Sequence, residues 1–337
     1  MNEQNYYLKI LKKLCDAFGP SSFEDDILDI IQQILGQSFF HHITPHKNLI
    51  VFNPADKNKS GKTIVFQSHM DELGIKPRRY LDNGLIEVLP ISVISDDFNN
   101  QRVLFNPGNI TGIIIVKKED KNRKYFVDIG VSDREEAQKL VPIYAVGSAK
   151  NETEIKKDRI FGKCFDARAA VSAIVCAMHS KEFLAESPNK FVALFSSREE
   201  TTFWPHKEIA SAFKNLDLKP SLFVNIEICP GTMVPFDSPT GAVIDRGVAI
   251  AHMDNSYVSA PPVSKRIIEI GQKHDIICQD MVSRAGNGEL GKLCYELETD
   301  GIGFALPAFA MHSPNSIISR NDYFSLIEFI KAIIKDY

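Results

Sequence analysis

The chain has 337 residues, of which 44% are hydrophobic and 24% charged, a balance typical of a folded globular protein and unlike that of a disordered or fibrous one. A formal net charge of -4 provides no general positive field for phosphates, which disfavours nucleic acid as a partner. No stretch approaches the roughly 18 apolar residues that cross a bilayer, and the six cysteines are too dispersed for a disulfide framework. We therefore expect a cytoplasmic protein without a membrane partner.

The chain begins with two predicted helices within residues 5–36, separated by a Gly-Pro break at 19–20. Ser21 and Glu24 have the spacing of a capping box for the second helix. Apolar runs of strand length follow from residue 48 as NLIVF, KTIVFQ, KFVALFS and SLFVNI. The helical pattern ARAAVSAIVCAMHSKEF lies between the second and third runs. This alternation predicts an α/β fold with an open mixed sheet flanked by helices.

The stretch 73–162 departs from this alternation. Short β-like segments, GLIEVLPI, GIIIVKK, KYFVDI and IYAVGS, are separated by Asn, Gly and charged turns. The charge run KKEDKNRK at 117–124 indicates a solvated hairpin turn. We interpret residues 73–162 as a small all-β domain inserted into an α/β domain made of residues 1–72 and 163–337.

Side chains that can bind metals follow the predicted strands. KTIVFQ leads into SHMDE, which places His69 and Asp71 on one face of the extended chain, where a carboxylate can steady a metal-binding imidazole. FVALFSS leads into Glu199 and Glu200. Because ligands bind at the carboxyl ends of parallel strands, we expect these side chains to meet at one edge of the sheet.

Three further candidates lie on other elements. Glu227 follows SLFVNI, and His312 follows GFALPAFAM. Asp166 opens the helix ARAAVSAIVCAM, where the helix dipole tolerates a carboxylate but where the residue could also be only a cap. Taken singly, a strand-end histidine is more often hydrogen-bonded than a ligand, and adjacent glutamates are usually solvated.

The number of these residues is the stronger signal. Two histidines and three carboxylates at one buried edge would need one another, or cations, to offset the burial of their charges. Mixed nitrogen and oxygen donors suit zinc, cobalt or manganese better than calcium. Such a set, with one bridging carboxylate, suffices for two divalent ions.

A series of motifs runs in order along nearly the whole chain: FGPSSFEDDI, HKNLIVF, SHMDELG, YFVDIGVSDREEA, GKCFDARAAVSAIV, SSREE, FVNIEI and LPAFAMHSP. Together they resemble the glutamyl-aminopeptidase and tetrahedral-aminopeptidase family of dinuclear metallopeptidases, some of whose members have been labelled endoglucanases. The resemblance implies the dinuclear zinc-peptidase fold and an enzyme that removes N-terminal residues from peptides. It also implies that residues 73–162 build a dimer and larger homo-oligomers.

The resemblance implies five metal ligands, a pair for each ion and one shared carboxylate: His69 with Glu227, Glu200 with His312, and Asp166 bridging. It further implies that Glu199 is the general base and that Asp71 supports His69. Water bridging two cations can have a pKa of about 7, which provides a metal-bridging hydroxide at neutral pH. Glu199 would take the remaining proton and return it to the leaving amine.

Three positions depart from the family's usual pattern. Ala167 stands where a second Asp commonly follows the bridging one, and Glu227 replaces the commoner Asp. TTFWPH at 201–206 replaces a Gly-containing stretch and places Trp204 and His206 near the expected pocket. For His206, a position at the start of a helix is the simpler interpretation. The preferred terminal residue of the substrate therefore stays open.

Two other functions stay open as well. One is a different amide hydrolase, such as a carboxypeptidase or deacylase, that uses the same pair of ions. The other is a catalytically degenerate, self-assembling binding protein, an idea motivated by Ala167 and by the stretch 201–206. Retention of all five ligand types and of the candidate base favours an enzyme.

Other motifs carry weaker signals. GNGELG at 286–291 fits the G-x-G-x-x-G pattern, but too little chain follows for a dinucleotide-binding half, and no acidic residue lies about 20 positions on at the end of a second strand. His41, His42 and His46 favour a solvated strand and turn over a metal site. Cys164 is better explained as a small core residue than as a ligand.

Overall fold

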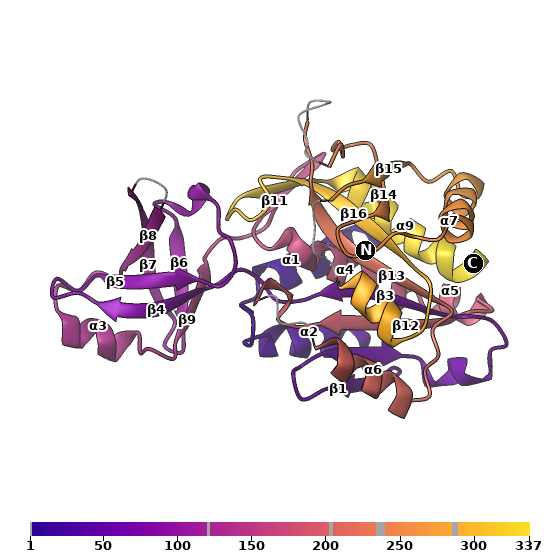
Figure 1. Ribbon diagram of the computed structural model, residues 1–337, viewed down its shortest axis with the longest axis horizontal. Helices are drawn as coiled ribbons and strands as arrows, with labels where there is room; N and C mark the ends of the chain where they lie inside the picture. Colours follow the sequence, from indigo (N-terminus) through magenta and orange to yellow (C-terminus); the bar gives the residue numbers. More distant parts are fainter. Residues whose placement is uncertain (1, 120–121, 202–204, 234–239, 285–288) are drawn as a thin grey trace.

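The computed structural model describes residues 2–119, 122–201, 205–233, 240–284 and 289–337. They form a large mixed sheet flanked by helices and a separate, small closed β-barrel, which confirms the predicted fold class (Figure 1). In Figure 1 the barrel stands to one side of the larger unit. Among the described helices, none combines the length and the apolar character needed to traverse a bilayer.

The large sheet has four parallel strands at its centre. In spatial order, its main path contains β1 (Phe40–Ile43), β2 (Leu49–Phe52), β12 (Lys190–Ser196), β3 (Thr63–His69), β13 (Leu222–Pro230), β16 (Gly301–Phe309), β17 (Ser316–Ser319), β11 (Arg159–Gly162) and β10 (Glu154–Ile155). Off this path, β14 (Val248–Met253) pairs with β16 and with β15 (Cys278–Val282). Because β12, β3, β13 and β16 are parallel, their carboxyl ends lie along one edge.

Helices pack on both faces of this sheet. The face with the larger core is covered by α1 (Glu3–Asp16), α2 (Asp25–Leu35), α4 (Phe165–His179), α5 (Lys181–Glu186), α7 (Pro261–Lys273) and α9 (Arg320–Asp336). The opposite face is covered by α6 (His206–Asn215) and α8 (Leu290–Glu296). The two helices predicted within residues 5–36 are α1 and α2.

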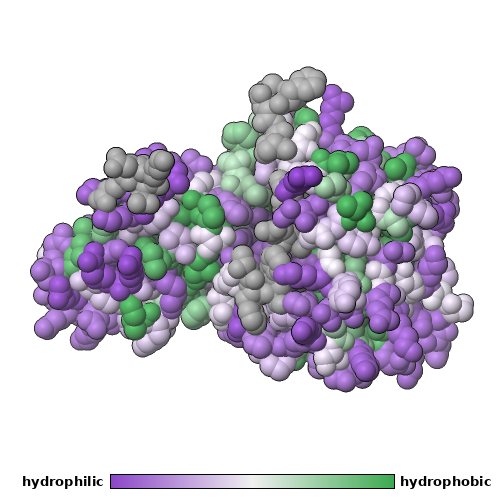
Figure 2. Space-filling view, in the orientation of Figure 1, coloured by the Kyte–Doolittle hydropathy of each residue, from purple (hydrophilic) through white to green (hydrophobic). Residues whose placement is uncertain are grey.

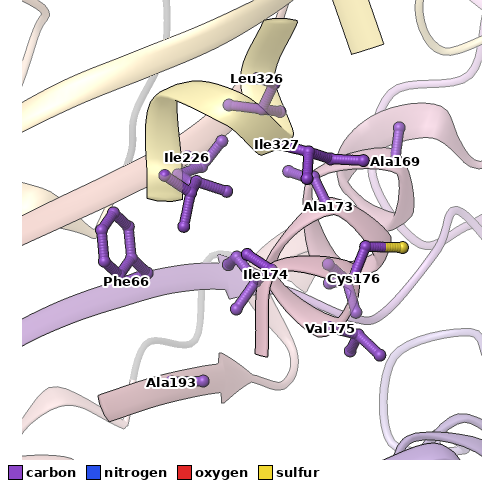
Figure 3. Packing of buried hydrophobic residues seen from close by; sticks show 14 of the residues in the cluster. Phe66, Ala169, Ala173, Ile174, Val175, Cys176, Ala193, Ile226, Leu326 and Ile327 are labelled. Atoms are coloured by element: carbon purple, nitrogen blue, oxygen red, sulfur yellow. The ribbon is translucent and has the colours of Figure 1, made fainter. Parts of the chain in front are cut away.

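Helix α4 lies at the centre of the larger core. Apart from Asp166 and His179, all of its residues are buried, and many are alanines that let neighbouring elements approach closely. Figure 3 shows α4 and α9 packed beside each other, with Ile174 of α4 on the side toward Phe66. Each large apolar side chain buried in this way contributes about 1.5–3 kcal/mol. The core therefore holds the parallel strands in a fixed array.

The barrel is closed by six strands within the described residues. In spatial order they are β4 (Ile75–Tyr80), β5 (Ile86–Pro90), β8 (Asn122–Asp128), β7 (Ile110–Glu119), β6 (Arg102–Asn106) and β9 (Val146–Ala149). The short helix α3 (Arg134–Leu140) lies between β8 and β9 in sequence, and β7 and β8 form the hairpin indicated by the charge run. Strands β10 and β11 fall within 73–162 but pair with the large sheet, so the precise extent of the inserted domain stays a prediction.

Apolar side chains occupy both the interior and parts of the exterior of the barrel. Val103, Phe105 and Val127 are buried in its own small core. Leu89 and Ile115 are exposed on the outside. Figure 2 shows apolar patches between polar ones on the face of the barrel that is in view. Part of the outer surface of the barrel is therefore apolar.

The capping box predicted at Ser21 and Glu24 is wrong. Helix α2 begins at Asp25, and Glu24 makes no side-chain capping bond to it. The Ser21 hydroxyl instead donates to Asp71 Oδ2 at 2.6 Å, and Glu24 accepts a bond from the backbone N–H of Ser22 at 2.7 Å. A buried carboxylate distant in sequence competes successfully for the hydroxyl, because leaving that carboxylate unpaired would be unfavourable.

Phe66 offers a test of the larger core. It is fully buried, and its ring centroid lies 4.9 Å from that of Phe191. We expect Phe66→Ala to lower the free energy of unfolding by roughly 3–5 kcal/mol, because it removes buried area and leaves a cavity. Phe40→Ala is the matched control, since Phe40 is 40% exposed. Urea denaturation followed by circular dichroism measures both, and equal losses would contradict this description of the core.

Candidate metal centre

The carboxyl edge of the parallel strands brings the predicted site residues together. His69 is the last residue of β3, and Glu199 and Glu200 lie in a 3-10 turn, η3 (Glu199–Thr201), just after β12. Asp166 lies in the first turn of α4, and His312 follows the end of β16. Residues far apart in the chain thus meet because adjacent parallel strands end at the same edge.

Asp166 lies between two imidazole rings. Its Oδ1 is 3.2 Å from Nε2 of His69, and its Oδ2 is 3.2 Å from Nε2 of His312. A second carboxylate approaches each ring: Glu227 Oε2 is 3.5 Å from His69 Nε2, and Glu200 Oε1 is 4.0 Å from His312 Nε2. His69, Asp166 and Glu200 each offer a potential ligand atom, and these atoms lie within 4.8 Å of one another.

The backbone explains how two of these carboxylates reach the cluster. Glu227 lies within β13 rather than after it, but the pairing of β13 with β3 ends at Asn225. Glu227 therefore projects beyond the last rung that the two strands share. Asp166 and Ala167 have non-helical backbone angles although they belong to the first turn of α4. Asp166 consequently presents its carboxylate to the two histidines instead of acting only as a helix cap.

The cluster concentrates negative charge in a buried place. Burial, together with the neighbouring carboxylates, raises the pKa of Glu199 to about 8 and that of Glu200 to about 7. The pKa of Glu227 is raised well above its usual range for the same reasons. Burial opposes ionisation of Asp166 as well, but hydrogen bonds from His312 and His69 outweigh it and lower the pKa. The protein alone therefore leaves this cluster with an excess of carboxylates.

Several buried atoms of the cluster have no hydrogen-bond partner within the described residues. They include Glu200 Oε1 and Glu227 Oε1. A buried polar atom without a partner is unfavourable by about 1–3 kcal/mol, more for a charged group. Divalent cations would accept electron pairs from carboxylate oxygens and imidazole nitrogens, the donor types that zinc and its neighbours prefer. The residues present therefore fit a metal centre.

Asp71 contacts several members of the cluster and holds them in place. It is fully buried, with Oδ1 3.5 Å from His69 Nδ1. Its two oxygens also accept bonds from the backbone N–H groups of Glu199 at 3.1 Å and Glu200 at 3.2 Å. Burial opposes ionisation, but the bonds from His69, Ser21 and the backbone outweigh it and lower the pKa of Asp71. One carboxylate thus joins the end of β3, the turn η3 and the loop before α2.

A second buried network lies next to the first and was not predicted from the sequence. Glu72 accepts bonds from Lys163 Nζ at 2.8 Å and Arg168 Nη2 at 3.3 Å, and also from the backbone N–H of Gly19 at 3.0 Å. Arg168 also donates to the Met70 and Gly19 carbonyls. A Cβ on Gly19 would lie 2.5 Å from Arg168 Nη2, so the loop needs glycine there. An arginine within an alanine-rich helix was the signal that could have revealed it.

The histidines of the stretch 41–46 and Cys164 lie in ordinary structural settings. His41 and His42 belong to the partly exposed strand β1, and His41 Nε2 lies 3.0 Å from the Gly36 carbonyl. His46 pairs with Glu208. These contacts confirm the interpretation as a strand and turn. The Cys164 thiol donates to Glu72, which places it in the support network rather than among the candidate ligands.

Parts of two predicted features lie outside the described residues, namely residues 202–204 of TTFWPH, which include Trp204, and residues 286–288 of GNGELG. Gly291, the last glycine of that motif, packs so closely that a Cβ would lie 2.1 Å from the Ser256 carbonyl oxygen. His206 is the first residue of α6, which confirms the simpler interpretation, and its Nε2 lies 3.8 Å from Glu296 Oε1. Packing thus accounts for this glycine without a bound dinucleotide.

Solved structures share this fold along nearly the whole chain. The chain matches a TET aminopeptidase from a marine sediment archaeon of the Thaumarchaeota with a TM-score of 0.89 at 19% identity, covering 98% of this chain and 97% of that one. The TET1 peptidase of Pyrococcus horikoshii, which can assemble into a tetrahedron or a large octahedral shell, gives 0.84 at 21% identity and covers 98% and 100%. These likenesses establish the fold.

Sequence comparison identifies the family. A protein of Acetivibrio thermocellus, provisionally named an aminopeptidase, is 27% identical over 344 residues, which cover 99% of this chain and 100% of that protein. The sequence profile of the M42 glutamyl aminopeptidases matches residues 48–329, a range that contains all the candidate ligands. The chain belongs to the M42 glutamyl aminopeptidase family.

Proposed function

We propose that this protein is an aminopeptidase that hydrolyses the N-terminal residue from peptides with the help of two divalent metal ions. The observation that carries the proposal is the position of Asp166, whose two oxygens each face the Nε2 atom of a different histidine at 3.2 Å. A carboxylate between two nitrogen donors is the arrangement expected of a ligand that bridges two ions. Membership of the M42 family supports the same activity.

Each ion would have its own pair of ligands in addition to Asp166. His69 and Glu227 lie on one side of the bridging carboxylate and would hold the first ion. Glu200 and His312 lie on the other side and would hold the second. Zinc suits this mixture of nitrogen and oxygen donors, and cobalt and manganese suit it as well. Positive charge at both places would offset the mutual repulsion of the carboxylates.

When bound, the ions would acidify a water molecule and polarise the peptide carbonyl. Glu199 is then the proton carrier of the chain: it takes a proton from the attacking water and delivers it to the leaving nitrogen as the C–N bond breaks. Asp71 accepts hydrogen bonds from the backbone N–H groups of both Glu199 and Glu200. It therefore fixes the position of the base relative to the candidate ligand Glu200.

We also propose a homo-oligomer in which residues 73–162 form the dimer contact. Apolar residues exposed on the barrel, including Leu89 and Ile115, support an interface there. The assemblies described for the TET1 peptidase of Pyrococcus horikoshii support it by analogy. Peptides are the expected substrates, and the six unpaired cysteines are consistent with the reducing cytoplasm.

A substrate panel tests the activity directly. We expect purified, zinc-loaded protein to cleave peptides with a free α-amino group and to leave the same peptides intact when that group is acetylated. Mass spectrometry of the products measures both. Cleavage of the acetylated peptides instead would favour a carboxypeptidase or deacylase. Two bound ions with no hydrolysis across a broad panel would favour a binding protein that no longer catalyses.

The role of Glu199 is tested by Glu199→Gln. The amide cannot carry the proton, so we expect turnover to fall by about 10²- to 10⁴-fold. Metal content, measured by mass spectrometry of the elements, should stay at two ions per chain because Glu199 is not a proposed ligand. Glu135→Gln, an exposed position on α3, is the matched control and should keep full activity. Undiminished turnover in Glu199→Gln would refute the assignment.

Metal removal tests the centre independently of chemistry. We expect chelation to lower the melting temperature, because ligands that bind only the folded state stabilise it by about 2.7 kcal/mol at about 100 times their dissociation constant. Adding zinc back should restore both the melting temperature and the activity, and titration should end at two equivalents. A chelated protein with an unchanged melting temperature and full activity would contradict the proposed centre.

A further inference from the structure

His312 is held by the barrel side of the molecule and not only by its own strand. Its ring nitrogen Nδ1 lies 2.9 Å from the Val93 carbonyl oxygen. Its own carbonyl accepts a bond from the backbone N–H of Ser95 at 3.2 Å. Val93 and Ser95 lie between β5 and the 3-10 turn η2 (Asp96–Phe98), within the predicted insertion. Side chain and main chain of His312 are thus both bonded to one short segment.

The two histidines of the cluster differ in how they are fixed. His69 ends a central strand, its side chain is 2% exposed, and Asp71 and Asp166 lie on either side of its ring. His312 lies beyond the end of β16, its side chain is 27% exposed, and its φ is 60°, an uncommon conformation for a residue other than glycine. Such a conformation persists only where surrounding contacts enforce it. Val93 and Ser95 provide two such contacts, one to the ring and one to the main chain.

The bond to Val93 also decides which ring atom faces the cluster. A carbonyl oxygen only accepts hydrogen bonds, so Nδ1 of His312 must carry a proton. A metal would therefore displace the Nε2 proton that bonds to Asp166, which leaves the Nε2 lone pair aimed toward Asp166 and Glu200. That is the form of histidine that binds a metal.

The segment is itself anchored in the barrel. Ile94 and Phe98 are both buried in the core of the barrel, one on each side of Ser95 in sequence. The backbone N–H of Ile91 donates to the Gly74 carbonyl at 2.7 Å, and that of Asn100 donates to the Ile114 carbonyl at 2.8 Å. The position of the barrel therefore determines where Val93 and Ser95 present their backbone groups.

We infer that residues 91–98 are a positioning element of the metal centre, and that the affinity of the His312 side for its ion depends on the docking of the barrel. The inference rests on the proposed function, because it takes His312 as a ligand. The ion near His69 has no such dependence, since His69 and Glu227 lie on strands of the large sheet and the shared Asp166 lies on α4. The barrel would then contribute to the centre through backbone groups, without providing a ligand.

Ser95→Pro tests the inference by removing one hydrogen bond between the segment and His312. Proline removes the N–H that bonds to His312, and Ser95 has φ −73°, which proline adopts without strain. Ser95→Ala is the matched control: it loses the hydroxyl, which caps η2 through Asp97, but keeps the N–H. We expect Ser95→Pro to weaken one of two zinc-binding events by about 10-fold in calorimetry, because it removes one hydrogen bond that fixes the main chain of His312. Ser95→Ala should bind both ions as the unaltered protein does.

Activity gives a second readout. With excess zinc, Ser95→Pro should recover the kcat of the unaltered protein with the same KM, because the defect lies in ion affinity and not in the pocket. A merely structural role of Ser95 would instead lower the melting temperature of the zinc-free protein and alter both binding events together. That result, or two binding events of unaltered affinity, would overturn the inference.

A measurement on the unaltered protein covers the case in which Ser95→Pro does not fold. Coupling is reciprocal, so zinc binding must in turn stabilise the segment that holds His312. We expect hydrogen exchange of peptides within residues 91–98 to slow when zinc is added to the zinc-free protein. Unchanged exchange beside two confirmed binding events would refute the inference alone. Absence of zinc binding to the unaltered protein would refute the proposed function.

Discussion

The structure depends on the concentration of carboxylates at one buried edge of a parallel sheet. Asp166 lies between His69 and His312, and further carboxylates approach from β13 and η3. In a low-dielectric setting, like charges this close repel, and burial together with this repulsion raises the pKa of Glu199 to about 8. The fold tolerates this edge because the strands below it are locked by a large apolar core, and because cations fit the cluster.

Buried hydrogen bonds and ion pairs next to the cluster hold this edge in place. Asp71 binds the backbone of η3 and the hydroxyl of Ser21, and Glu72 pairs with Lys163 and Arg168. Removing one partner from such a network leaves a buried charge uncompensated, which is strongly destabilising. The loop between α1 and α2 therefore belongs to the architecture of the site although it provides no ligand. The insertion plays a corresponding part for His312.

Much of the fold and of the cluster could be predicted from sequence because the signals are local. KTIVFQ and SLFVNI are continuous apolar runs, as strands buried on both faces must be, and they form β3 and β13. Charged or histidine residues after such runs mark strand ends, and parallel strands end at one edge. The resemblance to the family indicated which candidate ligands would share an ion.

By itself the sequence determined the alternation of strands and helices, the inserted β-rich stretch and the residue types at the strand ends, since each depends on spacing within a few residues. Only the tertiary structure decided which side chains form hydrogen bonds with one another. Ser21 pairs with Asp71 rather than capping α2, and His312 is held by Val93, 219 positions away in the chain. A hydroxyl or an imidazole has several local partners of similar energy, and only the packed fold selects the buried group that would otherwise be left without one.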